Sequence, residues 1–437
     1  DDRYFAEFNF GYNGSENFTP KNRYGFFPSV GLGWVISNES FFEPLTNVIQ
    51  YLKVRGTWGQ VGNSQISGRR FAYLATVTDS SSTSYTFGKN MDQNYGTTAI
   101  DEYAVDVTWE VADKTDIGVD MRLLNNKLNL QFDYFKESRE GIYLRRSSIP
   151  SYVGMINNPY GNIGKVENKG FELLVNYANS WGGDWSLSLM GNYSFNRNKV
   201  LEDDSTVVYP WQNTIGNKVG QRFGLVALGL FESYGEIAAS PVQTGDTRPG
   251  DIKYKDINGD GKIDEYDKVP IGWGSVPEIM YGFGFSVGWK NLSLTAMFQG
   301  AAHVDAMLSG EGVLPFSQGS SRGNLLSNIT DRWTEENPRQ NAFYPRLSIG
   351  NINMNYEEST WWLKDTDYLR LKNIELSYRL PDHWMKRIHL DNARIFIQGV
   401  NLLTFSSFKI WDVELGDGRG ARYPNIASVS LGVNFNF

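Results

Sequence analysis

The acidic segment 256–267 has the residue types and spacing of a cation-binding loop. Oxygen donors recur along it at short intervals, and such donors converge on a single hard cation such as Ca²⁺. The donors occupy positions one, three, five, seven, nine and twelve of a twelve-residue loop: Asp256, Asn258, Asp260, the Lys262 carbonyl, Asp264 and Asp267. Gly261 supplies the turn at position six. We predict a structural calcium ion that stiffens this loop; the alternative is a solvated acidic turn.

Tryptophans in the polar stretches form a second set of candidates. Aromatic faces give apolar contact to sugar rings and cation–π contacts to positive groups. We predict that Trp211 and Trp273 bind substrate. Trp361 and Trp362 precede a predicted strand, so they fit better in an aromatic girdle. Packing within a loop or a girdle is the alternative for each single Trp.

The chain offers no constellation for catalysis. Its three histidines, His303, His383 and His389, are far apart, and no arrangement with Asp and Ser accompanies them. The absence of cysteine removes disulfides, thiolate metal sites and Cys nucleophiles. A net charge of −8 argues against a nucleic-acid partner. We therefore predict that the chain is not an enzyme.

The segment 427–437 represents the element that recurs along the chain. Its apolar residues alternate strictly with small or polar ones: Val429, Leu431, Val433, Phe435 and Phe437. Side chains on a strand alternate between faces, so this strand has one apolar and one polar face. Its length suits a tilted membrane-spanning strand of about 9–11 residues. The high aromatic content, 14%, fits an aromatic girdle.

About twelve segments carry this alternation and are predicted as strands. They cover residues 4–12, 30–36, 52–58, 116–123, 128–134, 171–177, 185–195, 281–289, 292–299, 374–380, 393–403 and 427–437. No run of 18 apolar residues exists, so the sequence predicts no transmembrane helix. The prediction is an all-β chain.

Long and short connections alternate between these strands. Residues 136–168 and 197–279 form long links, whereas 125–126 and 290–291 are tight turns. Outer-membrane barrels have this asymmetry, with short periplasmic turns and long extracellular loops, whereas propellers and sandwiches do not. We predict a transmembrane antiparallel β-barrel rather than a soluble all-β protein. The last strand then runs inward and places Phe437 at the periplasmic rim.

Four segments carry a family resemblance. They are G-D-I-K-Y-K-D-I-N-G-D-G-K-I-D at 250–264, W-L-K-D followed by Y-L-R-L-K-N within 362–373, N-L-L-T-F-S-S-F at 401–408 and R-Y-P at 422–424. In order and spacing they resemble segments of the SusC/RagA family of TonB-dependent outer-membrane transporters. Phe408 stands where that family usually has Tyr. The resemblance extends over the whole chain.

This resemblance implies a fold, a location and partners. Residues 1–437 would be the C-terminal part of a barrel of 22 strands in the outer membrane, with the plug, the TonB box and the first strands outside this chain. The implied function is TonB-dependent import of oligosaccharides or peptides with a SusD-like lipoprotein as an extracellular lid. A soluble or surface carbohydrate-binding module and a passive porin are the competing hypotheses.

Overall fold

A computed structural model describes every residue except 1, 67, 90, 92, 317–324, 389 and 437. His389 and the predicted rim residue Phe437 therefore lie outside the described residues. Across the part of the chain that the structure describes, no helix is long and apolar enough to cross a membrane.

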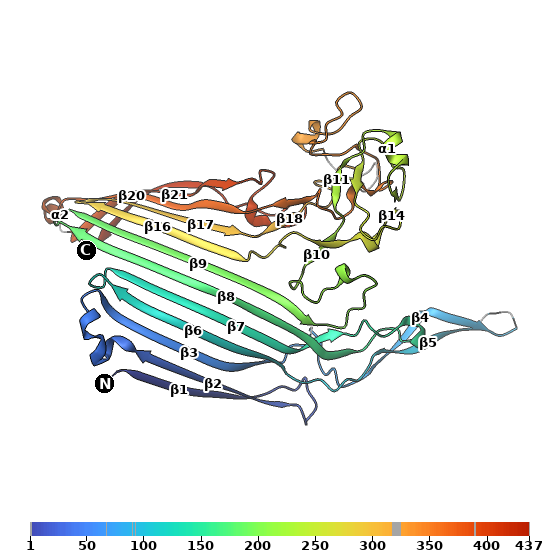
Figure 1. Cartoon of the computed structure of the whole chain (residues 1–437), viewed down its shortest axis with the longest axis horizontal. Helices are drawn as coiled ribbons and strands as arrows, with labels where there is room; N and C mark the ends of the chain where they lie inside the picture. The colour runs from blue at the N-terminus through green and yellow to red at the C-terminus, as the bar shows by residue number, and fades with distance from the viewer. Residues whose placement is uncertain are drawn as a thin grey trace.

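One antiparallel sheet of twelve strands dominates the molecule, and its strands are neighbours in chain order (Figure 1). The number of strands and their positions confirm the prediction. The strands are β1 (Tyr4–Gly14), β2 (Tyr24–Val35), β3 (Ile49–Asn63), β6 (Glu110–Leu123), β7 (Leu128–Arg145), β8 (Tyr160–Trp181), β9 (Trp185–Glu202), β16 (Ile279–Trp289), β17 (Leu292–Ala302), β20 (Tyr368–Arg379), β21 (Asn392–Ser406) and β22 (Ser428–Asn436).

The alternating sequence separates the sheet into an apolar and a polar face. Phe283 on β16 is paired in register with Phe298 on β17, and their rings stack with centroids 5.0 Å apart. On the opposite face Ser286 is paired with Thr295, and their hydroxyl oxygens lie 3.0 Å apart. Each cross-strand pair therefore joins side chains of the same kind, which stabilises this register.

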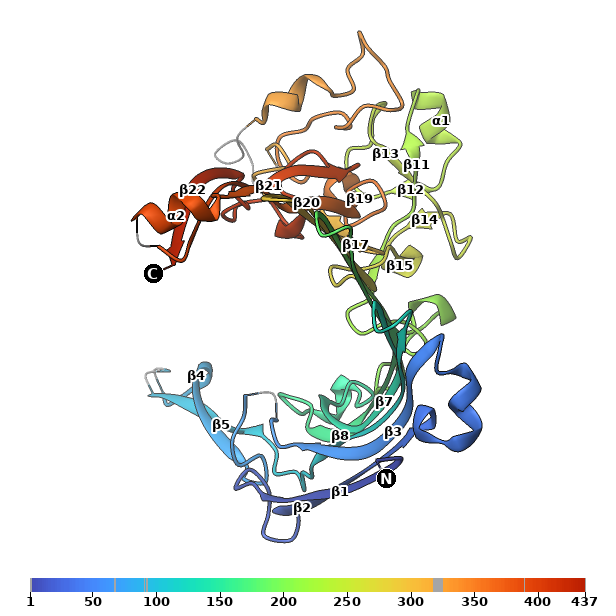
Figure 2. The same ribbon diagram turned by 90° about the vertical axis from the view of Figure 1, so that its left-hand side faces the viewer.

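The sheet is curved into an open arc (Figure 2). β1 and β22 stand at the two ends of the strand order and do not pair with each other. The short turns gather at one end of the strands and the long connections at the other (Figure 1). This asymmetry matches the predicted one.

Several strands run further than their apolar alternation. β7 continues to Arg145 and β8 starts at Tyr160, so the predicted loop 136–168 is wrong for most of its length. The extensions carry charged residues such as Glu137 and Arg139, which conceal a strand from hydrophobic periodicity. The region 60–115 likewise contains a hairpin of β4 (Thr76–Phe87) and β5 (Gln93–Glu102), which projects from the long-loop end (Figure 1).

The other long connections contain short paired elements rather than irregular chain. The strands are β10 (Arg222–Gly224), β11 (Ala227–Leu230), β12 (Val242–Gln243), β13 (Ile252–Tyr254), β14 (Lys262–Ile263), β15 (Val269–Ile271), β18 (Asp305–Met307) and β19 (Leu363–Asp365). The helices are α1 (Tyr234–Ala238) and α2 (Asp382–Ile388), together with the 3₁₀ turns η1 (Ile36–Asn38), η2 (Ser40–Leu45), η3 (Ser151–Val153), η4 (Pro210–Gln212), η5 (Glu265–Asp267), η6 (Ser327–Thr330), η7 (Met354–Tyr356) and η8 (Val413–Leu415).

Three long connections share a hydrophobic core, which we call the loop core. Its buried members are Leu225, Leu230, Ile252, Tyr254, Ile263, Ile271, Met307, Leu308, Val313, Leu314, Trp333, Ala342, Tyr344, Trp362, Phe408 and Val413. Trp362 is 1% exposed and Trp361 packs against the same cluster, so their predicted place in an aromatic girdle is wrong. These indoles instead join connections that are far apart in the sequence.

Candidate functional site

The polar face of β3, β6 and β7 is charged. The Arg55 guanidinium contacts three carboxylates, with Nη1 3.0 Å from Asp116, Nε 3.5 Å from Asp120, and Nη2 in contact with Asp133. Nearer the long-loop end, Arg139 Nη1 lies 3.0 Å from Glu110 Oε1. Carboxylates outnumber cations in this network, so this face attracts positive groups.

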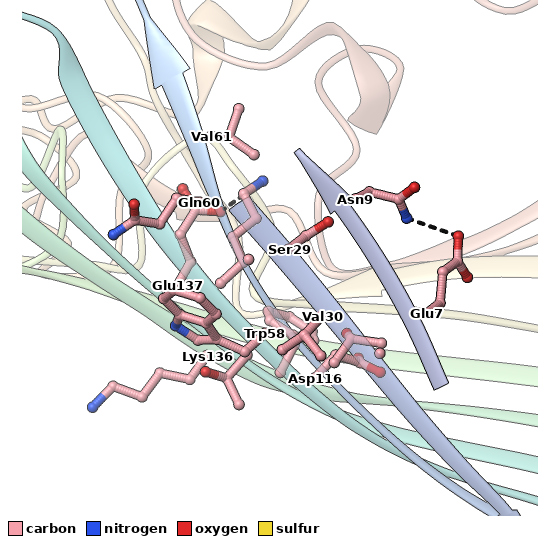
Figure 3. A pocket seen from close by; sticks show the side chains of 16 residues that line it. Glu7, Asn9, Ser29, Val30, Trp58, Gln60, Val61, Asp116, Lys136 and Glu137 are labelled. Atoms are coloured by element: carbon pink, nitrogen blue, oxygen red, sulfur yellow. Dashed lines mark hydrogen bonds and ion pairs between the residues drawn. The ribbon is translucent and has the colours of Figure 1, made fainter. Parts of the chain in front are cut away.

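A groove of about 570 Å³ crosses the same charged region (Figure 3). Its polar lining includes Glu7, Asn9, Ser29, Thr57, Lys114, Asp116 and Glu137. Asn9 donates a hydrogen bond of 2.7 Å to Glu7, and Lys114 pairs with Glu137 at 3.2 Å. The lining can therefore both donate and accept hydrogen bonds.

The polar face of β9, β16 and β17 carries short neutral side chains instead. Ser188, Asn192, Ser286, Thr295 and Gln299 occupy it in cross-strand register. A second groove, of about 600 Å³, is lined by Asn192 and Gln299 together with Met280, Met297 and, from the neighbouring strands β7 and β8, the carboxylates Asp133 and Glu172. Hydroxyl and amide groups without charge suit a neutral solute that is rich in hydrogen-bonding groups.

Trp273, a predicted substrate-binding residue, lies beside the start of β16. Its ring stacks on His303 with centroids 4.0 Å apart and planes 4° from parallel, and the Lys218 ammonium lies 5.2 Å from its centroid. The indole is nevertheless 42% exposed. Lys218 also pairs with the buried Glu278 at 3.2 Å, so the ring is fixed in place with part of its surface open to a ligand.

The backbone around Trp273 is held by a buried carboxylate. Asp305 accepts hydrogen bonds from the amides of Trp273 and Gly274, and Arg222 Nη1 lies 2.5 Å from its Oδ1. Burial raises the pKa of Asp305 above its usual value, although the hydrogen bonds and the Arg222 charge oppose that shift. Asp305, the first residue of β18, therefore links that strand to the connection that carries Trp273 and Gly274.

Trp211, the other predicted substrate-binding residue, belongs to a separate cluster. Its ring stacks on Tyr209 with centroids 4.6 Å apart, and its Nε1–H donates to the Tyr266 carbonyl at 2.8 Å. Among the contacts of the described residues, none joins the rings of Trp211 and Trp273. The structure instead ties Trp211 to the predicted cation loop, because Gln212 also donates to the Glu265 carbonyl at 2.9 Å.

The segment 256–267 is a compact turn built from carboxylate-to-amide hydrogen bonds. Asp256 accepts from the amides of Gly259 and Gly261 at 2.6 and 2.9 Å. Asp267, which is fully buried, accepts from Ile257 and Asp264 at 2.7 and 2.9 Å. Within the described residues no group of three or more acidic or histidine side chains is placed to hold a metal ion. Calcium binding therefore stays a prediction.

Buried polar groups in the long connections were missed by sequence reasoning. Asp251 Oδ1 lies 2.9 Å from the Arg346 guanidinium and accepts from Asn353 and Asn355 at 3.1 and 2.8 Å. These partners are about one hundred residues apart along the chain. No local spacing could have indicated them, since only the tertiary fold brings them together.

Comparisons with known proteins match most or all of this chain. A family model described as TonB dependent receptor-like, beta-barrel, matches residues 2–402. TonB-dependent receptor P3 of Formosa agariphila is 28% identical over 466 residues, covering 100% of this chain and 44% of the relative. TonB-dependent receptor SusC of Bacteroides thetaiotaomicron is 26% identical over 453 residues, covering 100% of this chain and 42% of the relative.

A solved structure gives the same fold. The structure of the RagAB peptide transporter matches with a TM-score of 0.74 and 22% sequence identity, over 100% of this chain and 46% of the matched chain. The chain thus spans less than half the length of the relatives that it matches.

Proposed function

The chain belongs to the TonB-dependent receptor-like β-barrel family, of the SusC/RagA type, and from this premise we propose that it takes part in TonB-dependent import of oligosaccharides across the outer membrane. It is part of an integral outer-membrane barrel, so the apolar face contacts lipid and the polar face lines the lumen. The family is one of receptors and transporters rather than enzymes.

The neutral lumen wall of β9, β16 and β17 is the observation that carries the proposal. Its Ser, Thr, Asn and Gln side chains offer hydrogen bonds without charge, which matches the hydroxyl groups of a neutral oligosaccharide. The exposed indole of Trp273 at the long-loop end adds an aromatic surface for a sugar ring. Trp211 contributes indirectly, by fixing the neighbouring turn.

Peptide import is the second candidate, and a different observation favours it. The lumen wall of β3, β6 and β7 carries an excess of carboxylates around Arg55, which would attract basic peptides. The fold also matches that of a protein named as a peptide transporter. A soluble carbohydrate-binding module is excluded by the family assignment.

The partners of the whole protein are proposed on the same basis. Within the described residues, β1 and β22 each pair with a single strand of the sheet, and an unpaired edge in lipid is costly. We assign to the part of the protein beyond this chain the remaining strands, the plug and the contact with TonB. A SusD-like lipoprotein would close over the long connections as a lid.

We also propose a structural Ca²⁺ in segment 256–267. Gly259 and Gly261 adopt φ values of +76° and +82°, which a tight twelve-residue loop requires. The ion would be held by Asp256, Asn258, Asp260, the Lys262 carbonyl, Asp264 and Asp267. Because η5 within this loop contacts Trp211 and Gln212, the ion would stiffen the adjoining connection.

Uptake by cells that express the full-length protein tests the function. Labelled neutral oligosaccharides of mixed linkage and labelled peptides of mixed charge are supplied, with and without TonB and with and without the lid lipoprotein. We expect TonB-dependent accumulation of an oligosaccharide that fails without the lid. Accumulation of peptides alone would establish peptide import. Uptake that is unchanged when TonB is absent would indicate a passive pore.

A further inference from the structure

Three basic residues form a row across neighbouring strands on the apolar face. Lys136 on β7 is the register partner of Lys169 on β8, and Lys169 is the partner of Arg197 on β9. Their side chains are 51%, 57% and 48% exposed. Like charges directly opposite each other on a sheet repel, so such a row needs an anionic neighbour to be favourable.

Each of these cations lies next to an aromatic residue on the lipid-facing side of its own strand. Tyr134, Phe171 and Phe195 lie two residues closer to the turn end on the same three strands. The rings of Phe171 and Phe195 are 5.8 Å apart, which places both on one face. The Arg197 guanidinium lies 5.5 Å from the centroid of Phe195, so the cation shares that face with the rings.

The row stands at the outer edge of the apolar band. At roughly 2.5 Å of depth per residue of a tilted strand, Lys136 lies about 20 Å beyond Leu128, close to the height of about 25 Å expected for the band. Because the strands tilt, the row shifts about 3 Å in depth per strand, or about 6 Å in total. The headgroup layer on each side of a bilayer is of similar thickness, about 5–7 Å.

Protein carboxylates neutralise the row only in part. Glu167 lies 2.8 Å from Lys136 and 3.5 Å from Lys169, so one carboxylate serves two ammonium groups. Glu278 pairs with Arg197 at 2.7 Å, but it also pairs with Lys218 at 3.2 Å. The pairs of Lys136 and Lys169 with Glu167 involve exposed ammonium groups and are weak, which leaves cationic capacity for an external anion there, whereas the buried Glu278 holds Arg197 more firmly.

From the register, the depth and the charge we infer that Lys136, Lys169 and Arg197 bind the phosphate groups of a phosphorylated lipid in the outer leaflet. Phosphate oxygens accept charge-assisted hydrogen bonds from ammonium and guanidinium groups. The acyl chains of the same lipid would lie along Tyr134, Phe171 and the apolar band below. The row faces lipid rather than the lumen, and its Arg197 also borders the candidate sugar site, because it shares Glu278 with Lys218 and lies 6.0 Å from the centroid of the Trp273 ring.

The test uses the full-length protein in nanodiscs that contain phosphate-bearing lipid A, or the same lipid A after removal of its phosphates. Retained lipid is counted by native mass spectrometry. The variant is K136Q/K169Q/R197Q, and the matched control is K127Q/K290Q/R379Q, which removes three cations near the turn end. Heat-dependent migration in gels verifies that each barrel is folded.

We expect the wild type and the control to retain about tenfold more phosphorylated than dephosphorylated lipid A, and the triple variant to lose most of that preference. Equal retention of the two lipids by the wild type would overturn the proposal, as would an undiminished preference in the triple variant. If the triple variant does not fold, K136Q/K169Q decides, because it leaves the Arg197–Glu278 pair intact.

Discussion

The strand wall and the loop core use the same large apolar residues in opposite ways. On the wall, Phe8 is 64% exposed and Leu431 is 78% exposed, whereas Tyr344 and Trp362 in the loop core are 0% and 1% exposed. The wall meets lipid, so its apolar side chains point outward and its polar ones inward. The long connections meet water and therefore bury their apolar side chains. The same chain thus folds in two environments, with lipid around the strand wall and water around the long connections.

The largest effect is expected from a cavity in the loop core. Trp362→Ala removes a buried indole and leaves the Asn355 carbonyl, 2.7 Å from the indole nitrogen, without its donor. We expect the long connections to lose about 3–5 kcal/mol of stability. Protease sensitivity of the connections and urea unfolding in vesicles measure it.

Trp289→Ala is the matched control, because Trp289 is 46% exposed at the turn end of the wall. A loss of about 1 kcal/mol or less is expected there. Equal losses for the two substitutions would contradict the assignment of separate environments.

The next effect is a comparison of the same substitution, to Arg, at two adjacent residues of β9. Leu189 faces lipid and Ser188 faces the lumen at the same depth. Leu189→Arg should cost about 2–4 kcal/mol of folding free energy near the bilayer midplane. The Ser188→Arg variant should fold nearly normally and instead show reduced uptake, because the long charged side chain narrows the lumen beside the neutral wall. Folding yield in vesicles and solute uptake separate the two, and similar folding of both variants would count against the orientation.

A smaller, pH-dependent effect belongs to a contact between a long connection, which carries Asp412, and the start of β20, which carries Arg370. Burial raises the pKa of Asp412, but the hydrogen bond and charge of Arg370, at 2.8 Å, together with backbone hydrogen bonds from Glu414 and Asn425, more than offset this, so that pKa lies below its usual value. Stability from this pair is therefore present above about pH 4 and is lost as the pH falls through the lowered pKa.

Unfolding of the connections followed from pH 6 to pH 2 measures this loss. Asp412→Asn should remove part of the acid dependence. An identical pH profile in the variant would show that the pair contributes nothing.

The smallest effect concerns the predicted ion. With an affinity typical of extracellular calcium modules, millimolar Ca²⁺ would stabilise the loop by about 0.4–1.4 kcal/mol. Chelation should therefore increase hydrogen exchange of segment 256–267 and leave the strand wall unchanged. Asp260→Ala, which removes the oxygen donor at position five, should abolish the response. A hydrogen-exchange rate that is the same with and without Ca²⁺ would contradict the proposed calcium site.

The wall could be predicted from the sequence, whereas the loop core could not. Alternation of apolar and polar residues is a local signal, so each strand can be recognised within about ten residues of sequence. The loop core joins Leu225, Trp333, Trp362 and Phe408, which no periodicity links. The charged ends of β7 and β8 give no strand signal in the sequence, because the apolar alternation fades beyond the membrane.

The candidate site was predictable only in its residue types. The sequence indicates Trp273 only as an aromatic residue in a polar stretch, whereas its stack on His303 depends on the start of β16 and the end of β17 lying side by side. The same sequence pattern indicates Trp211, whose indole donates a hydrogen bond to the turn at Tyr266. Whether either indole binds a solute stays a prediction.

Cysteine accessibility along β9 in the outer membrane tests the central claim, that the polar face is a water-filled lumen and the apolar face meets lipid. This chain has no cysteine, so single replacements are clean once any cysteine elsewhere in the protein is removed. Ser188→Cys, Leu189→Cys, Met190→Cys and Gly191→Cys are each exposed to a membrane-impermeant thiol reagent. We predict labelling at 188 and 190 and none at 189 and 191. Labelling that does not alternate would contradict the account.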